Sequence, residues 1–233
     1  MMQTTAMTSI SPRHHIGDAQ IQAVESWAAC GLKVLSFNSP SEIEQLRDRY
    51  PSVEFVPVYH TMEGVQKVPY VPISAFIEYA KRNEVGQIML INSDIAINDP
   101  NGLVRNYCGR AHDGLIFANR EDHNGDGNGK RYIHGFDVFI IHSNHYHLIT
   151  QSMFCMGQTW WDYWIPFQFI MAKVPITLVK EPLFFHRAHP IQYSGQEWVR
   201  MTEHFQWMTG QYKGQRPQQV NDQVFRTIIR HAR

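Results

Sequence analysis

The segment 88–94 combines a buried strand with a carboxylate at the strand's end. Its first four residues form an apolar run without alternation, which is typical of a strand covered on both faces in a parallel sheet. Asn92, Ser93 and Asp94 follow at once, and open α/β sheets bind ligands at the carboxyl ends of their strands. If the exit stays extended, Asn92 and Asp94 point the same way and suit a hard divalent cation with its phosphates. The alternative is an Asx turn that ends the strand.

Two histidines could complete such a metal site. His186 and His189 follow a predicted strand, and their spacing places two imidazoles close together in a turn. Imidazole ligates transition metals well, although a pair of partly exposed histidines ending a strand is the alternative. Since Asp94 and His186 both follow strands, they can meet at one edge of the sheet and hold Mn²⁺ or Mg²⁺ against diphosphate oxygens.

A further candidate lies at the start of an aromatic helix predicted over residues 160–171. Thr159 can cap this helix, and Asp162 in its first turn is stabilised as the anion. Asp162 is either an N-terminal charge beside core aromatics, or a general base or acceptor-binding carboxylate, with tryptophans of the helix stacking on a sugar ring. Asp137, at the start of a strand predicted over residues 136–141, is a weaker candidate.

Residues 120–130 are too polar and too rich in glycine to be anything but a loop. Asp122, Asn124 and Asp126 alternate as in a calcium-binding loop, but Ile133 stands at the twelfth position, where an EF-hand needs an acid. The flanks are predicted strands, not helices. A surface or lid loop is therefore favoured over a weak cation site, and both are favoured over an EF-hand.

Composition describes an ordinary soluble globular protein. The 233 residues are 43% hydrophobic and 18% charged, with a formal net charge of zero, which argues against electrostatic binding to nucleic acid or an anionic membrane. No apolar run approaches the roughly 18–20 residues of a membrane span, and residues 1–16 lack the apolar segment of a signal peptide. Three separated cysteines without a CxxC pair indicate reduced, mostly buried thiols, so we expect a cytoplasmic location.

The elements that must position these residues alternate as β-α units through about residue 100. Strands are predicted over residues 4–10, 32–37, 53–59 and 88–91. Helices are predicted to begin at Asp18, at the capping box Ser39-Pro40-Ser41-Glu42 and at Asp99-Pro100. One more helix is predicted from the apolar face formed by Ile73, Phe76, Ile77 and Ala80. This alternation predicts a mostly parallel sheet with right-handed crossovers.

The second half is less regular, with strands predicted over residues 114–118 and 176–179 and a closing helix over residues 218–229. No repeat or linker divides the chain. We predict one domain over residues 1–233, with a nucleotide-binding half (about 1–100), an acceptor-side half (about 101–200) and a C-terminal extension (201–233).

Five short motifs occur in order between about residues 4 and 193: Thr4-Thr5, Asn92-Ser93-Asp94-Ile95, Gly135 with Asp137 and Phe139, Gly157 with Trp161-Asp162 and Trp164, and His186 with His189. In this order they resemble the nucleotide-diphospho-sugar transferases of the glycosyltransferase A (GT-A) fold. The resemblance implies a single-domain, Rossmann-like α/β fold with a mostly parallel central sheet flanked by helices.

The resemblance also implies roles for individual residues. Asp94 and His186 would bind the metal that holds the donor diphosphate, and Asp137 and Asp162 would face the donor sugar and the acceptor. The residues expected at the nucleotide are Thr8, Ser9, Ser11, Arg13, Asn92 and Ser93. Those expected at the sugar or acceptor are Trp161, Trp164, His189 and Arg120. The family's metal motif usually has two acids, and Asn92 replaces the first, which weakens the expected metal site.

These residues predict a metal-assisted hexosyltransferase that moves a sugar from a nucleotide-diphosphate donor to an acceptor hydroxyl, with carbohydrate as the expected acceptor. The cation would offset charge on the leaving nucleoside diphosphate, and Asp162 would take the acceptor's proton, so that in-line attack inverts the anomeric centre. The weakened metal motif keeps open a non-catalytic sugar- or nucleotide-binding protein on the same fold. A sugar-nucleotide pyrophosphorylase is disfavoured because residues 9–17 contain one Gly and one Arg.

Overall fold

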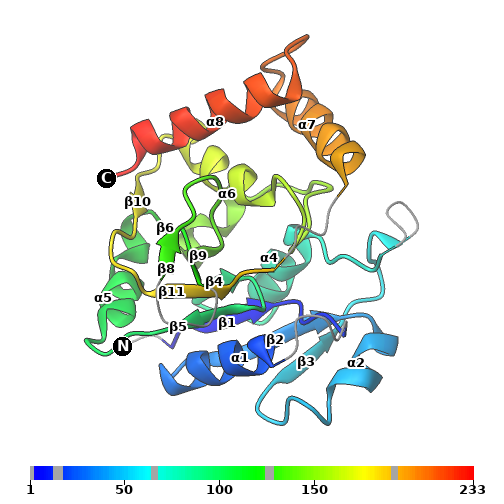
Figure 1. Cartoon of the computed structure of the whole chain (residues 1–233), viewed down its shortest axis with the longest axis vertical. Coiled ribbons are helices and arrows are strands. Elements are labelled where there is room, and N and C mark those ends of the chain that lie inside the picture. Colours follow the sequence, from blue (N-terminus) through cyan, green and yellow to red (C-terminus); the bar gives the residue numbers. More distant parts are fainter. Residues whose placement is uncertain (1–2, 13–17, 64–67, 124–128, 190–193) are drawn as a thin grey trace.

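A seven-stranded sheet runs through the centre of the molecule, in the order β10-β6-β9-β4-β1-β2-β3 (Figure 1). The computed structural model of the chain describes residues 3–12, 18–63, 68–123, 129–189 and 194–233. The strands are β1 (Thr5–Thr8), β2 (Lys33–Asn38), β3 (Glu54–Pro57), β4 (Gln87–Ile91), β6 (Leu115–Ala118), β9 (Val138–His142) and β10 (Ile176–Leu178).

The sheet is mostly parallel, as predicted. β1 pairs in parallel with both β2 and β4, β2 with β3, and β6 with β10. Only β9, among the described strands of this sheet, runs antiparallel to its neighbours β4 and β6. The carboxyl ends of β1 and β4 therefore lie side by side at one edge, where an α/β sheet binds its ligands.

Both faces of the sheet are covered by helices, which confirms that the strand at residue 88 is buried on two sides. Ile88 and Leu90 face the core formed with α4 (Ile73–Arg82) and α6 (Trp161–Met171). Met89 and Ile91 face the core formed with α1 (Ala19–Ala29) and α5 (Leu103–Arg110). All four side chains are fully buried.

Local side chains cap two of the predicted helices, α2 and α5. α2 (Pro40–Leu46) has the expected capping box, in which the Ser39 N–H donates to the Glu42 carboxylate at 3.1 Å. α5 begins at Leu103, later than expected, because the Asp99 carboxylate accepts hydrogen bonds from the N–H groups of Leu103 and Val104 at 2.7 and 2.8 Å. Asp99 thus caps the helix from a preceding turn.

A second, smaller sheet lies beside the first and has the order β5-β11-β7-β8. Its strands are β5 (Ile95–Ile97), β7 (Glu121–His123), β8 (Gly129–Arg131) and β11 (Phe184–Arg187). The prediction that residues 120–130 form only a loop was wrong at both ends, because β7 and β8 pair antiparallel. Ladder hydrogen bonds join backbone groups, so these polar segments can pair without an apolar face. Residues 124–128 lie outside the described residues.

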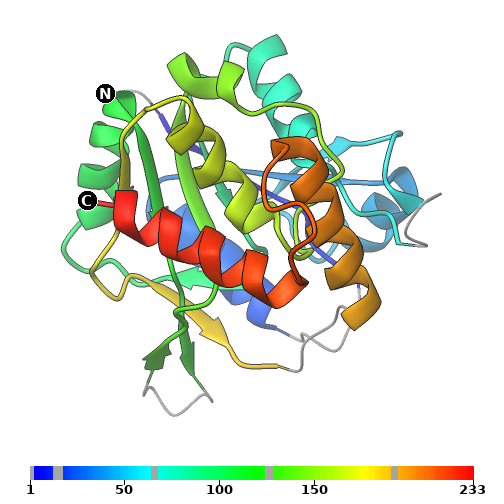
Figure 2. The same cartoon turned by 90° about the horizontal axis from the view of Figure 1, so that it is seen from above.

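The C-terminal helices α7 (Gly195–Thr209) and α8 (Pro217–His231) lie over α6, on the side of the sheet away from α1 (Figures 1 and 2). The closing helix was predicted, but α7 was not. Its inward residues, Met201 and Phe205, are fully buried but are separated by polar residues that hide the pattern. Nowhere in the described ranges is there a helix with the length and apolar character to cross a membrane. The cysteines were expected to be mostly buried, but only Cys155 is buried; Cys108 is half-buried and Cys30 is exposed.

Candidate active site

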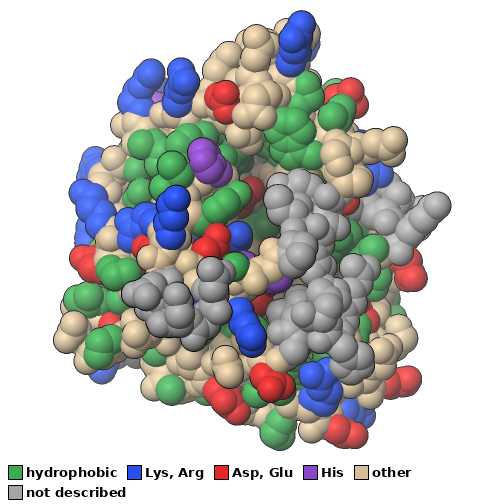
Figure 3. All heavy atoms as spheres, in the orientation of Figure 1, with side chains coloured by type: hydrophobic (Ala, Val, Ile, Leu, Met, Phe, Trp, Pro, Cys, Tyr) green, Lys and Arg blue, Asp and Glu red, His purple; other side chains and the backbone are tan. Residues whose placement is uncertain are grey.

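A central pocket of about 530 Å³ lies at the carboxyl ends of β1 and β4. Its walls come from the segments after these two strands, from α2, and from the segments that precede α4 and α6. The chain between β8 and β9 and single residues in or next to β7, β11, α7 and α8 complete them. Figure 3 shows a hollow on this face in which acidic, basic and histidine side chains gather. The volume is in the range of about 300–1,000 Å³ that is usual for small-molecule sites.

Three potential metal ligands meet in the central pocket: Asp94, His186 and His189. The His189 Nε2 lies 3.1 Å from the Asp94 Oδ2, and the His186 Nε2 lies 3.5 Å from the same oxygen. One ligand atom from each residue lies within 4.8 Å of the other two. Asp94 and His186 were expected to meet, whereas His189 was assigned to the sugar or the acceptor.

Strand register explains why these residues converge. β11 runs antiparallel to β5 with His186 opposite Ile95, which places the imidazole next to Asp94 at the preceding position. β11 also runs parallel to β7, with His186 opposite Asp122. The Asp122 Oδ1 lies 2.8 Å from the His186 Nδ1, and with the proton on Nδ1 the Nε2 lone pair would be left for a metal ion.

The donor set fits a divalent transition ion. Two imidazole nitrogens and one carboxylate oxygen suit Mn²⁺ better than Mg²⁺, which prefers oxygen ligands. Burial alone would raise the pKa of Asp94, but hydrogen bonds from His186 and His189, together with their charge, lower it overall. The Asp94 carboxylate is therefore ionised at neutral pH, as a metal ligand must be.

Asn92 does not join this group. The chain turns at Ser93 and Asp94 instead of staying extended, so the condition for Asn92 and Asp94 to point the same way is not met. The Asn92 side-chain amide donates to the Asp137 Oδ1 at 2.8 Å, and its own Oδ1 is buried without a partner. Asn92, at the first position of the expected metal motif, thus holds a second carboxylate.

Arg120 connects Asp122, which lies beside the potential metal ligands, to Asp137 on the other side of the pocket. Its Nε donates to the Asp122 Oδ1 at 2.8 Å, and a terminal nitrogen donates to the Asp137 Oδ1 at 3.0 Å. The guanidinium also lies over the Tyr132 ring, 4.4 Å from its centroid. Arg120 lines the pocket, but its charge is balanced by carboxylates of the protein itself.

Asp137 and Asp162 form the second acidic part of the central pocket. Asp137 is 4% exposed, and its Oδ2 is buried without a partner. The Asp162 Oδ2 accepts a 3.3 Å hydrogen bond from the Phe136 N–H. Burial and the charge of Asp137 raise the pKa of Asp162 to about 7, against the opposing effect of backbone N–H groups. A carboxyl with this pKa can accept or release a proton near neutral pH.

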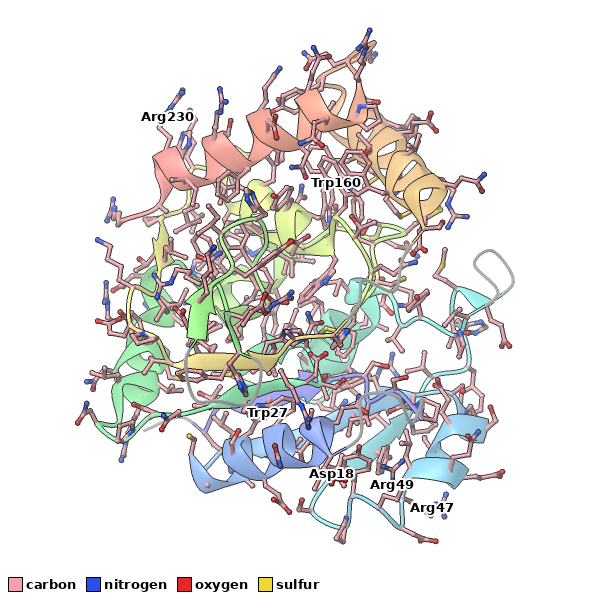
Figure 4. All side chains as sticks on the ribbon, viewed as in Figure 1. Asp18, Trp27, Arg47, Arg49, Trp160 and Arg230 are labelled. Atoms are coloured by element: carbon pink, nitrogen blue, oxygen red, sulfur yellow. The ribbon has the colours of Figure 1, made fainter. Side chains whose placement is uncertain are left out.

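The turn before Asp162 is strained. Trp160, at the N-cap of α6, has a φ of 74°, in the left-handed region that favours glycine. Its indole is buried against Tyr163 and Phe205, with ring centroids 5.6 and 4.8 Å away, and Figure 4 shows it between α6 and α7. Packing of this ring holds the strained backbone and so fixes the place of Asp162.

Only some of the residues expected to bind the nucleotide line the central pocket. Ser9, Ser11 and Ser93 line the central pocket, whereas Thr8 is fully buried within β1 and does not. Arg13 lies outside the described residues.

Gln20 of α1, a residue that the sequence analysis did not single out, joins the loop after β1 to the turn after β4. With its side-chain oxygen facing the Ser11 N–H, its amide pairs with both backbone groups of Ser11 at 3.0 Å. The same oxygen accepts a 2.7 Å hydrogen bond from the Ser93 hydroxyl. Gln20 therefore holds the loop after β1 against the turn after β4.

The tryptophans differ from expectation. Trp161 and Trp164 are both 2% exposed, and they pack against Phe139 and Phe154 with centroids 5.1 and 5.2 Å apart. Trp161 reaches the wall of the pocket, but Trp164 does not line it, so its role is to pack the core. Trp198 of α7 lines the pocket instead. Its helical spacing from Met201 and Phe205 is a weak signal in the sequence, because polar residues lie between them.

No family model and no curated protein matches the sequence. Among solved structures, the chain is similar to TarS of S. aureus, a glycosyltransferase, with a TM-score of 0.59 and 10% identity over 99% of this chain. The chain spans 43% of the TarS chain.

Two further solved structures are similar at lower TM-scores. A candidate nucleotide-diphospho-sugar transferase from Desulfovibrio desulfuricans G20 matches at 0.43, with 9% identity over 100% of both chains. A candidate glucose-1-phosphate thymidylyltransferase from Bacillus anthracis matches at 0.39, with 9% identity over 63% of this chain and 74% of its own. At such identities the likeness concerns the fold alone: the chain has a Rossmann-like, GT-A-type α/β fold.

Proposed function

We propose that the protein is a metal-assisted glycosyltransferase of the hexosyltransferase type, which transfers a sugar from a nucleotide-diphosphate donor to an acceptor hydroxyl with inversion. The observation that supports this most is that one pocket holds both the Asp94–His186–His189 group and Asp162. The fold shared with TarS adds support by analogy.

In this proposal, the donor diphosphate lies at the metal-ligand end of the central pocket. Asp94, His186 and His189 would hold Mn²⁺, which when bound neutralises diphosphate charge and favours departure of the nucleoside diphosphate. Ser9 and Ser11, in the loop that Gln20 holds, would contact the nucleotide.

The remaining carboxylates would act on the sugar and the acceptor. Asp162 takes the proton of the acceptor hydroxyl while its oxygen attacks the anomeric carbon, and the bond from that carbon to the diphosphate oxygen breaks with its electron pair. Attack opposite to the leaving group inverts the anomeric centre. The buried, unpartnered Oδ2 of Asp137 would accept a hydrogen bond from a hydroxyl of the donor sugar.

A thermal-shift screen of UDP, GDP, ADP, CDP and dTDP with and without Mn²⁺ tests the donor class and the metal together. At least one nucleoside diphosphate should raise the unfolding temperature, more so with Mn²⁺, because ligands that bind only the folded state stabilise it. His186→Ala should remove the part of the rise in unfolding temperature that depends on Mn²⁺.

Turnover is tested separately by measuring release of the nucleoside diphosphate from the matching nucleotide sugars. Release with Mn²⁺ is expected. Binding without release from any donor or acceptor would favour the non-catalytic binding protein, and no binding at all would refute the proposal.

A further inference from the structure

We propose that the end of the central pocket beside α7 and α8 is an acceptor subsite for an uncharged pyranose sugar, with Trp198 as the surface on which the ring stacks. That the bound sugar is an acceptor rests on the proposed function. The sugar site itself is defined by residues that the donor does not need. It extends the site to the C-terminal helices.

The pattern of α7 directs Trp198 into the pocket. Trp198, Met201 and Phe205 are spaced three and four residues apart, so they share one face of the helix. Met201 and Phe205 are buried in the core at 1% and 0% exposure, whereas Trp198 is half-buried and lines the pocket. The inward face of α7 therefore continues past the core and covers one end of the pocket.

Comparison with the other tryptophans shows that this position is unusual. Four of the six tryptophans are at most 2% exposed and pack within the two cores, and Trp207 is 74% exposed on the outer face of α7. Trp198 combines a place on the pocket wall with a partly accessible ring. A large aromatic side chain in that position offers an apolar face and an N–H group to a ligand.

Polar groups lie close to this surface. Asn221 of α8 also lines the pocket, and its side chain hydrogen-bonds to the hydroxyl of Tyr163. The same hydroxyl donates to the His134 carbonyl at 3.0 Å. Phe225, one turn after Asn221, stacks on Phe136 with centroids 6.1 Å apart, which keeps α8 at the pocket.

This combination suits a sugar. A pyranose ring has an apolar face of C–H groups, which an indole covers, and a rim of hydroxyls, which amide and carboxylate groups bind. Arg120 is the one Lys or Arg among the described residues of the pocket wall, and two carboxylates already pair with it. The charge of the wall therefore favours a neutral sugar over a phosphorylated one.

Ligand-observed saturation-transfer NMR on the full chain tests the inference, with methyl glycosides of glucose, galactose, mannose and N-acetylglucosamine as probes. Titrations are run alone and with Mn²⁺ plus the nucleoside diphosphate that stabilises the protein. At least one glycoside should bind. Trp198→Ala should lower its affinity about tenfold, the scale of one lost aromatic contact. Trp207→Ala, on the outer face of the same helix, should leave it unchanged.

Two more variants separate stacking from packing. Trp198→Phe keeps an aromatic face and should retain affinity within about threefold, whereas Trp198→Leu keeps apolar bulk without that face and should bind as weakly as Trp198→Ala. Equal unfolding temperatures across the set show that the fold is intact. Affinity for the nucleoside diphosphate should be unchanged in all of them.

The outcomes separate this inference from the proposed function. Absence of glycoside binding to the wild type, or equal binding by Trp198→Ala, overturns the acceptor subsite even if nucleotides bind. Loss of nucleotide affinity in Trp198→Ala also overturns it, because Trp198 would then serve the donor. Failure of every nucleoside diphosphate to bind the wild type refutes the proposed function, whereas the glycoside titrations without nucleotide still decide the sugar site.

Discussion

Replacing Asp162 by Asn should abolish sugar transfer and at the same time stabilise the fold at alkaline pH. The amide cannot take a proton from the acceptor, but it keeps the size of the side chain and an oxygen for the Phe136 N–H. Loss of activity with a gain in stability is the combination expected of a carboxylate whose ionisation is costly in the folded state.

The magnitude follows from the pKa of Asp162, which burial and the charge of Asp137 raise from 3.8 to about 7. At about 1.4 kcal/mol per pKa unit, this corresponds to about 4 kcal/mol. Because the folded state holds this proton more tightly than the unfolded chain, the contribution of Asp162 to stability falls as the pH rises from about 4 to about 7 and is constant above. The side chain is partly exposed, so screening by solvent makes about 4 kcal/mol an upper limit.

Urea unfolding of the wild type and Asp162→Asn at several values between pH 5 and pH 8.5 measures this difference. The variant's advantage should grow with pH and level off above about pH 8. Asp113→Asn, which changes a side chain that is 86% exposed, should show no such trend. A difference that does not depend on pH, or an Asp162→Asn protein with wild-type turnover, would refute the role of Asp162.

Three further outcomes follow from the same geometry. The kcat/KM of transfer should increase with pH through a midpoint near 7, because Asp162 acts only when deprotonated; a flat profile from pH 5.5 to 8.5 would contradict this. Asp122→Asn should weaken Mn²⁺ binding about 10–100-fold in calorimetric titration, since the His186 ring loses the carboxylate that orients it. Arg120→Met should destabilise the fold by about 3 kcal/mol in urea unfolding, because it leaves Asp137 without its cation; Arg131→Met, which breaks the more exposed pair with Glu121, should cost under about 1 kcal/mol.

The sequence alone predicted the β-α alternation and the mostly parallel sheet. Strand β4 was recognisable because a continuous apolar run from residue 88 to 91 fits a strand buried on both faces, and the helix with Ile73 and Phe76 was recognisable from its 3.6-residue period. Such patterns involve only residues that are close together in the chain, so they can be recognised from the sequence. The same reasoning predicted that Asp94 and His186 meet, and the structure brings them within 3.5 Å of each other. His186, however, lies within β11 of the second sheet and not after a strand of the first.

Partners distant in the chain were decided by tertiary structure. His189 rather than Asn92 joins Asp94, Asp122 orients His186, and Asn92 turns to Asp137. Each of these pairs joins residues that are 45 or more positions apart in the chain. A sequence records which side chains could bind a metal or a proton, but a single-residue change of register would exchange one face for the other.

The tryptophans show the same limit. Trp161 and Trp164 stand beside Asp162 in the sequence, and Trp198 stands far from it, yet Trp164 packs in the core and Trp198 lines the pocket. An aromatic residue at helical spacing can serve a core or a ligand equally well. Which of the two it serves depends on whether another element covers its face, and that is settled only when the helices pack.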